Sequence, residues 1–248
     1  MTLKPLYDAA KGVMRVIGFM SGSGSNIRRL LEYQHELEDK VYKIVGLFSD
    51  NPKSNAVEIG KEFGVPFFVN DIEAFYAKRG KPRKDLSLRP EFDIEAYRLL
   101  HPLEASVAAF GGYMSILSYV LVHAYTGVNV HPADLSVLKK NGTPTYTGDR
   151  AVAKAINAGE THLRSSTHIM ADKVDCGPIL MLSTKMLINQ EETPEKNQEH
   201  LKKHGDLVIF PKTLEYLAQG RFSIDTDTKI IHFDEKPIPF GVKLEDIK

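Results

Sequence analysis

Short apolar runs alternate with stretches of helical periodicity along most of the chain. Five runs, at residues 14–20, 43–48, 66–69, 105–110 and 127–130, have the length and composition of buried strands. The first two runs are each followed by a segment with helical spacing, at 26–37 and 56–63. Because strands that alternate with helices usually form a parallel sheet covered by helices, the pattern predicts an α/β fold with a mostly parallel central sheet.

The second half of the chain continues this alternation with shorter elements. The pattern predicts a helix over 149–157, a strand pair over 167–170 and 179–183, and one long helix over 194–217. Beyond residue 221 a further apolar and polar alternation around 229–233 indicates an additional hairpin.

Polar residues follow the fifth apolar run and the first strand of the later pair. Residues 129–132 read Asn-Val-His-Pro, and residues 175–178 read Asp-Cys-Gly-Pro. An amide, an imidazole and a carboxylate can together activate an amine and stabilise the charge that develops on a carbonyl oxygen, which is the chemistry of acyl transfer. Taken singly, Asn129, His131 and Asp175 are also ordinary turn and loop residues.

A glycine- and serine-rich loop separates the first strand from the first helix. Residues 21–26 read Ser-Gly-Ser-Gly-Ser-Asn, so the amides at the start of the helix would face an anion such as a phosphate. Ile27 occupies the place of the third glycine of the dinucleotide fingerprint, and the Lys of a Walker loop is absent. An ordinary capped turn is the alternative interpretation.

In this order and at these separations, the motifs resemble those of the formyltransferases that use 10-formyltetrahydrofolate. Within that family they are most similar to glycinamide ribonucleotide formyltransferase, over about Met14 to Arg221. The segments 110–118 and 166–168 also resemble the family's sequences. The resemblance implies a Rossmann-like formyltransferase fold in a single domain, residues 1–248, with a core of about 14–221, a short N-terminal extension and a β-rich C-terminal tail.

The resemblance also implies a role for each of the matching residues. Asn129 would donate to the oxyanion and His131 would shuttle a proton, while Asp175 would orient His131 and favour its charged form. The substrate phosphate would be held by Gly24, Ser25 and Asn26, the folate by Met114, Ile116, Leu117 and Arg89, and the acceptor by Asp206 and His168.

Three parts of the chain, namely 114–117, His168 and a basic cluster at 78–84, have alternative interpretations that the sequence leaves open. The run 114–117 is also typical of core packing, and His168 is equally consistent with a core histidine bonded to the backbone. The basic cluster at 78–84 is interrupted by Gly80 and Pro82, which favours a solvated loop over a site for an anionic substrate or nucleic acid.

Several departures from the family's pattern bear on the acceptor. Ser115 replaces an arginine, Asp206 replaces a glutamate, the loop 133–148 has a different sequence, and the stretch 70–104 is longer. The expected reaction is formyl transfer to glycinamide ribonucleotide in de novo purine synthesis. The alternatives are another amine, such as a sugar amine or methionyl-tRNA, hydrolysis of the formylfolate, and a non-catalytic folate- or nucleotide-binding protein.

Composition restricts the partners further. Lys and Arg together number 32, as do Asp and Glu, so no global positive field favours nucleic acid or an anionic membrane. The chain has one cysteine, and the sequence shows neither a secretion signal at Met1–Pro5 nor an apolar run of membrane length. These features predict a cytoplasmic location. We expect folate and a phosphorylated amine as the small-molecule partners, with a homodimer left open. The chemistry requires no metal, and His200 and His204 lack a third ligand.

Overall fold

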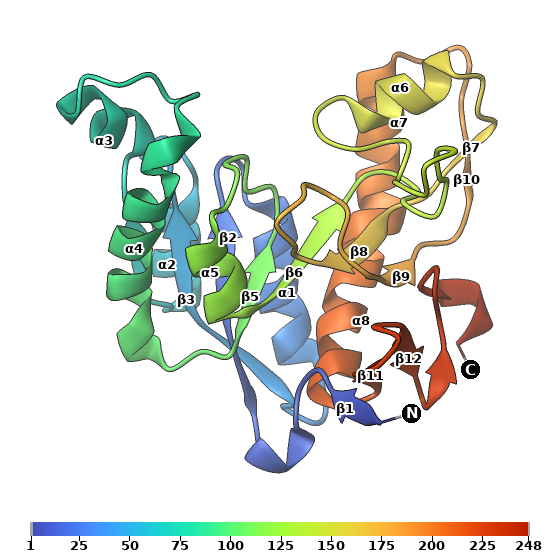
Figure 1. The fold of residues 1–248 in the computed structure, drawn as a ribbon, viewed down its shortest axis with the longest axis horizontal. Coiled ribbons are helices and arrows are strands. Elements are labelled where there is room, and N and C mark those ends of the chain that lie inside the picture. The colour runs from blue at the N-terminus through green and yellow to red at the C-terminus, as the bar shows by residue number, and fades with distance from the viewer. Residues whose placement is uncertain (1, 248) are drawn as a thin grey trace. The chain divides into compact units, whose positions relative to one another are not determined.

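The computed structural model describes residues 2–247, and the chain divides into two compact units (Figure 1). One unit is Gly12–Val128, and the other combines Met1–Lys11 with Asn129–Lys248. The single domain expected over residues 1–248 stays a prediction. Within the described residues, no helix is both long and apolar enough to cross a membrane.

The unit Gly12–Val128 is built on four parallel strands in the order β5-β2-β3-β4. Every residue of β5 is buried, as the apolar run at 105–110 predicts for a strand covered on both faces. The strands are β2 (Met14–Met20), β3 (Tyr42–Ser49), β4 (Phe67–Val69) and β5 (Val107–Phe110).

Five helices accompany these strands: α1 (Ser25–Glu36), α2 (Ala56–Phe63), α3 (Ile72–Lys78), α4 (Arg89–Leu100) and α5 (Tyr119–Ala124). The pattern predicted α1 and α2 but not α3 or α4, which lie on either side of the basic cluster. Their local signals are clear in the structure, because Asp71 caps α3 with its side chain and Pro90 occupies the first turn of α4.

The other unit contains mixed pairing. In the strand order β14-β9-β8-β6, β14 and β9 are parallel whereas β8 and β9 are antiparallel. The strands are β6 (Thr126–His131), which enters from the preceding unit, β8 (Ser166–Ile169), β9 (Ile179–Leu182) and β14 (Val242–Lys243). Mostly parallel strands flanked by helices confirm the predicted fold class.

The first strand of the chain pairs with three later strands in a separate antiparallel sheet with the order β1-β11-β12-β13. Its strands are β1 (Leu3–Pro5), β11 (Phe222–Asp225), β12 (Ile231–Phe233) and β13 (Lys236–Pro237). A two-stranded ribbon pairs β7 (His162–Leu163) with β10 (Met186–Leu187). The helices of this unit are α6 (Ala151–Asn157), α7 (Pro194–Leu201) and α8 (Leu207–Ala218).

The predicted continuous helix over 194–217 is wrong in one respect, because a π-helical turn at Lys202–Asp206 interrupts it. Gly205 lies so close to Ser165 that an added Cβ would be 2.3 Å from the Ser165 hydroxyl. That hydroxyl donates to Asp206 over 2.5 Å. This contact with a distant segment, together with Pro211 inside α8, accounts for a break that helical periodicity does not contain.

A buried carboxyl group ties α4 to the segment before α5. Asp93 is 0% exposed, and one of its oxygens accepts a 2.6 Å hydrogen bond from the Ser118 amide. Burial raises the pKa of Asp93 to about 6, and the contacts with Ser118 and Arg89 only partly oppose this shift.

We predict that Asp93→Asn removes a pH dependence from folding. The carboxyl has a higher pKa in the folded chain, so its contribution to stability is full below about pH 4 and is lost as the pH rises through about 6. The variant keeps an acceptor for Ser118 but does not titrate. Denaturant unfolding at several pH values measures how the free energy of unfolding changes with pH in each protein. We expect the wild type to lose up to about 3 kcal/mol that the variant does not lose. Asp39→Asn, at an exposed aspartate, is the control and should follow the wild type. The same dependence of unfolding free energy on pH in the wild type and in Asp93→Asn would contradict the prediction.

A second prediction concerns the turn between β8 and β9. A Cβ at Gly177 would lie 1.8 Å from the carbonyl oxygen of Ile169, and a backbone atom cannot move aside as a flexible side chain can. Gly177→Ala is therefore expected to destabilise the chain by about 1–3 kcal/mol in equilibrium unfolding. Gly22→Ala, where nothing lies within 4 Å of an added Cβ, is the matched control. Equal stabilities of the two variants would refute the close packing of this turn.

Candidate active site

Four polar side chains form one group: Asn129 and His131 on β6, His168 on β8, and Asp175 in the β8–β9 turn. His131 is 6% exposed and Asp175 is 7% exposed. The His131 Nδ1 atom lies 3.6 Å from Asp175 Oδ2, so the imidazole and the carboxylate face each other as the sequence predicts. The separation is longer than a direct hydrogen bond, so the pair interacts mainly through charge.

The orientation of His131 comes from a backbone group. Its Nε2 atom is 2.9 Å from the Tyr146 carbonyl oxygen. Because a carbonyl only accepts, Nε2 carries the hydrogen, and Nδ1 of the neutral ring presents its lone pair on the side of Asp175. Burial lowers the pKa of His131, and the charge of Asp175 opposes this shift without reversing it. The charge of Asp175 thus favours the charged imidazole, as expected, but burial has the larger effect and the pKa of His131 is lowered overall.

His168 connects the remaining members of the group. Its Nδ1 atom donates to the Ile169 carbonyl over 3.0 Å, and its Nε2 atom accepts from the Asn129 amide nitrogen over 3.0 Å. The same Nε2 lies 3.5 Å from Asp175 Oδ1. His168 is 1% exposed, so it is a core histidine bonded to the backbone and also a neighbour of the predicted catalytic residues.

Asp175 is held in an unusual conformation. Its φ is +52°, in the left-handed region that aspartate tolerates better than most residues. Its Oδ2 atom accepts a 2.7 Å hydrogen bond from the Gly148 amide. Burial alone would raise the pKa of Asp175, but polar contacts with His168, His131 and Gly148 outweigh it and lower the pKa to about 2. The carboxylate is therefore ionised at neutral pH.

The backbone of Tyr146 and Gly148 is the part of this site that sequence reasoning missed. Both residues belong to the 133–148 loop, whose sequence departs from the family's pattern. The loop nevertheless supplies the carbonyl that orients His131 and the amide that binds Asp175. A backbone hydrogen bond requires no particular side chain, so no residue type marks it in the sequence.

The predicted phosphate loop lies in the unit Gly12–Val128, at the start of α1. Gly24 adopts φ +66° and no side chain caps the helix. The first helical hydrogen bond runs from the Arg28 amide to the Gly24 carbonyl, which leaves the preceding amides without helical partners. The buried Ser25 hydroxyl and the buried side-chain oxygen of Asn26 have no hydrogen-bond partner within the described residues. The open amides and the Ser25 hydroxyl can donate hydrogen bonds, and such donors at the start of a helix favour an anion.

The segment after β5 is exposed and is not a buried helix start. Met114 is 61% exposed and Ile116 is 45% exposed, while Leu117 is partly buried. The core-packing interpretation of 114–117 is therefore wrong for Met114 and Ile116. Exposed apolar side chains at the carboxyl end of a parallel strand are available for an apolar ligand.

Arg83, from the basic cluster, is fixed to this segment. Its Nη2 atom donates to the Ser115 hydroxyl over 3.1 Å, and its Nη1 atom pairs with Glu73 at 2.9 Å. Ser115 in turn donates to the buried Asp50, which lies 3.8 Å from Arg83. The interpretation of 78–84 as a solvated loop is incomplete, because this guanidinium connects three segments of the unit. The buried position of Asp50 has no signature in the sequence.

Two further predicted site residues are enclosed. Arg89 is 4% exposed, and two of its guanidinium nitrogens have no hydrogen-bond partner in the described chain. The guanidinium carbon lies 5.6 Å from the centroid of the Tyr76 ring and 5.8 Å from the centroid of the Phe92 ring. Asp206 is 4% exposed and accepts from Ser165. Their contacts with folate and acceptor stay predictions. Across residues 2–247, no cluster of three or more His, Cys, Asp or Glu side chains is arranged to hold a metal ion.

Comparison with known proteins places this geometry in context. Residues 14–214 match the model of the formyl transferase family. The trifunctional purine biosynthetic protein adenosine-3 of Drosophila pseudoobscura is 27% identical over 83% of the chain, and the protein of that name from Bos taurus is 24% identical over 92%. The chain spans only 14% and 21% of the length of these two relatives.

Solved structures share the fold. The phosphoribosylglycinamide formyltransferase of Coxiella burnetii, solved with CHES, has a TM-score of 0.77 at 21% identity, covering 93% of this chain and 99% of that one. Glycinamide ribonucleotide transformylase 1 of Symbiobacterium toebii has a TM-score of 0.74 at 21% identity, covering 89% and 94%. These likenesses extend along most of both chains, and the family match covers both units described above. The protein therefore belongs to the formyl transferase family.

Proposed function

We propose that this chain transfers the formyl group of 10-formyltetrahydrofolate to the amine of glycinamide ribonucleotide, a step of de novo purine synthesis. The observation that carries the proposal is the group formed by the partly buried Asn129 and the buried His131, His168 and Asp175 in a formyl transferase chain. The relatives named above support the choice of reaction, since their names refer to purine synthesis and to this acceptor. A cytoplasmic location belongs to the same proposal.

The proposed chemistry needs a proton acceptor, an oxyanion donor and a permanent negative charge. The acceptor's amine attacks the formyl carbon, a new C–N bond forms, and the bond from that carbon to the folate nitrogen breaks. Neutral His131 accepts the amine's proton at Nδ1 and returns it to the departing folate nitrogen. Ionised Asp175 stabilises the imidazolium during this exchange, and it needs no protonation of its own because its pKa is about 2.

Asn129 and His168 act together in this scheme. One amide hydrogen of Asn129 is used by His168, so the other remains for the oxygen that becomes negative. His168 has both ring nitrogens engaged and is 1% exposed. We therefore assign it the role of positioning Asn129, in preference to a direct contact with the acceptor.

The other unit would bind the two substrates. Gly24, Ser25 and Asn26 would hold the phosphate of the acceptor through open amides and the Ser25 hydroxyl. The exposed Met114 and Ile116, with the partly buried Leu117, would contact the flat pterin of the folate. Arg89 would serve the folate's negative charge, which its unpartnered nitrogens favour.

One observation favours a second candidate, transfer to a different amine. Asp206, which stands in place of the family's glutamate, is buried and accepts from the Ser165 hydroxyl. A carboxylate engaged in this way is less able to bind the acceptor, and the loop 133–148 also departs from the pattern that the resemblance implies. Both features bear on the acceptor and leave the formyl donor and the reaction type unchanged.

A direct assay distinguishes these functions. The purified chain is mixed with 10-formyltetrahydrofolate and a set of amines that includes glycinamide ribonucleotide, its dephosphorylated form and a sugar amine. Absorbance follows the deformylated folate, and mass spectrometry identifies the formylated product. We expect turnover only when an amine is present, and most rapid turnover with glycinamide ribonucleotide. Turnover without an amine would indicate a hydrolase, and binding of folate without turnover would refute catalysis.

Removal of one charge tests the role of Asp175. Asp175→Asn keeps the side-chain volume and an acceptor for Gly148, but it cannot stabilise an imidazolium. We expect kcat to fall by about 10²–10⁴ with the fold and the folate affinity retained, as measured by steady-state kinetics, circular dichroism and calorimetric titration. Asp172→Asn, an exposed carboxylate in the same turn, is the control and should retain normal kcat. A near-normal rate for Asp175→Asn would rule out the proposed electrostatic role.

A further inference from the structure

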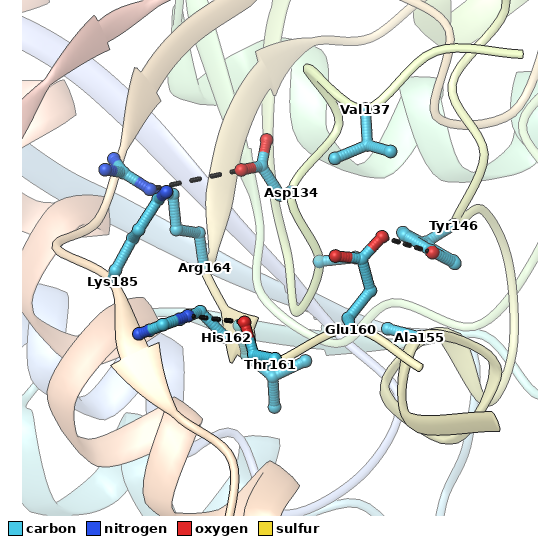
Figure 2. A pocket seen from close by; sticks show the side chains of 11 residues that line it. Asp134, Val137, Tyr146, Ala155, Glu160, Thr161, His162, Arg164 and Lys185 are labelled. Carbon is cyan, nitrogen blue, oxygen red and sulfur yellow. Dashed lines mark hydrogen bonds and ion pairs between the residues drawn. The ribbon is translucent and has the colours of Figure 1, made fainter. Parts of the chain in front are cut away.

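A cavity is lined by residues between Ala133 and Lys185, among them Tyr146, whose carbonyl also binds His131 (Figure 2). Its volume is about 150 Å³. A protein cavity of this size accommodates a molecule of about six non-hydrogen atoms. Apolar side chains from Ala133, Val137, Ala155 and Leu163 form part of its lining.

Opposite charges stand at two sides of this cavity. Figure 2 shows Lys185 on one side, near Arg164, and Glu160 on the other, near Tyr146. Arg164 is already satisfied, because it donates to the Ser183 carbonyl over 2.8 Å and to Glu245 over 2.5 Å. It therefore serves as part of the wall.

Glu160 and Lys185 are the two charges that remain available. Oε1 of Glu160 accepts from the Tyr146 hydroxyl over 2.6 Å, and its second oxygen has no hydrogen bond within the described chain. Lys185 is exposed and makes no ion pair with any described residue. A molecule that carried a cation at one end and an anion at the other would satisfy both groups, whereas a singly charged molecule would satisfy one.

We propose that this cavity binds a small zwitterion, an α-amino acid of about six non-hydrogen atoms. Its ammonium group pairs with Glu160 and its carboxylate pairs with Lys185. Asp134, the other carboxylate in the lining, is already paired with Arg164 at 3.9 Å. The short side chain of the amino acid packs on the apolar part of the lining. Nothing in the proposed formyl transfer uses these residues.

Occupancy of the cavity would reach the catalytic pair through Tyr146. The phenol of Tyr146 lines the cavity and donates to Glu160, while its carbonyl accepts from His131. Two residues further along, the Gly148 amide binds Asp175. A ligand that fixes Glu160 therefore also fixes the 146–148 segment, which orients both His131 and Asp175. Because the ligand binds only the folded chain, it also stabilises the fold by mass action.

Binding can be measured without any formyl transfer, so this test is independent of the proposed function. Glycine, L-alanine and L-serine are titrated into the full chain by calorimetry and ligand-detected NMR. Ethylamine and propionate, each with one of the two charges, are the matched probes. We expect saturable binding of at least one amino acid, at least about tenfold tighter than either probe because two ion pairs form instead of one. Bound ligand should also raise the Tm.

Two variants keep the proposal falsifiable. Glu160→Gln retains an acceptor for the Tyr146 hydroxyl, and Lys185→Gln changes an exposed side chain, so both should fold. Each should weaken amino-acid binding about tenfold or more, with the exposed Lys196→Gln as the unaffected control. The proposal is overturned if none of the three amino acids binds, if ethylamine or propionate binds as tightly, or if both variants retain the wild-type affinity.

Discussion

The site depends on a single buried charge, the carboxylate of Asp175. A carboxylate at 7% exposure would normally take up a proton, because removing a charge from water is costly. Here a backbone amide donates to one oxygen, and two imidazoles lie within 3.6 Å of the carboxylate, so the pKa falls to about 2 although burial opposes it. The left-handed backbone of Asp175 and the close packing of Gly177 against Ile169 fix the turn that presents this group. A permanent negative charge in this position allows a neutral His131 to become charged transiently at a moderate cost.

Backbone groups, more than side chains, determine the geometry around that charge. The 146–148 segment orients His131 through a carbonyl and Asp175 through an amide, so its path matters while its sequence is less restricted. This explains how the loop 133–148 can depart from the family's sequence while the imidazole and carboxylate still face each other. In the other unit, the guanidinium of Arg83 binds the Ser115 hydroxyl from a different segment of the chain.

Most of the fold could be predicted from the sequence because its signals are local. Apolar runs located β2, β3 and β5, and the helix α2 begins and ends at Ala56 and Phe63 as predicted. The helices α3 and α4 were missed although their local signals are clear, whereas the other failures concern packing and burial. The π-helical turn follows from the packing of Gly205 on Ser165, the exposure of Met114 could not be inferred from an apolar sequence alone, and the lowered pKa of His131 reflects burial. The roles of Asn129, His131 and Asp175 stay predictions from their motifs, whereas the backbone groups that hold His131 and Asp175 leave no signal in the sequence.

The ionisation of Asp175 is the most direct test of this account. Carboxyl ¹³C NMR of the labelled chain can follow each aspartate through an acid titration, and the signal missing from Asp175→Asn assigns the residue. We predict that the Asp175 signal stays at its ionised position from neutral pH down to about pH 4 and titrates only near pH 2. A midpoint at or above the ordinary aspartate value of about 3.9 would contradict the central claim, because the site would then lack its permanent charge.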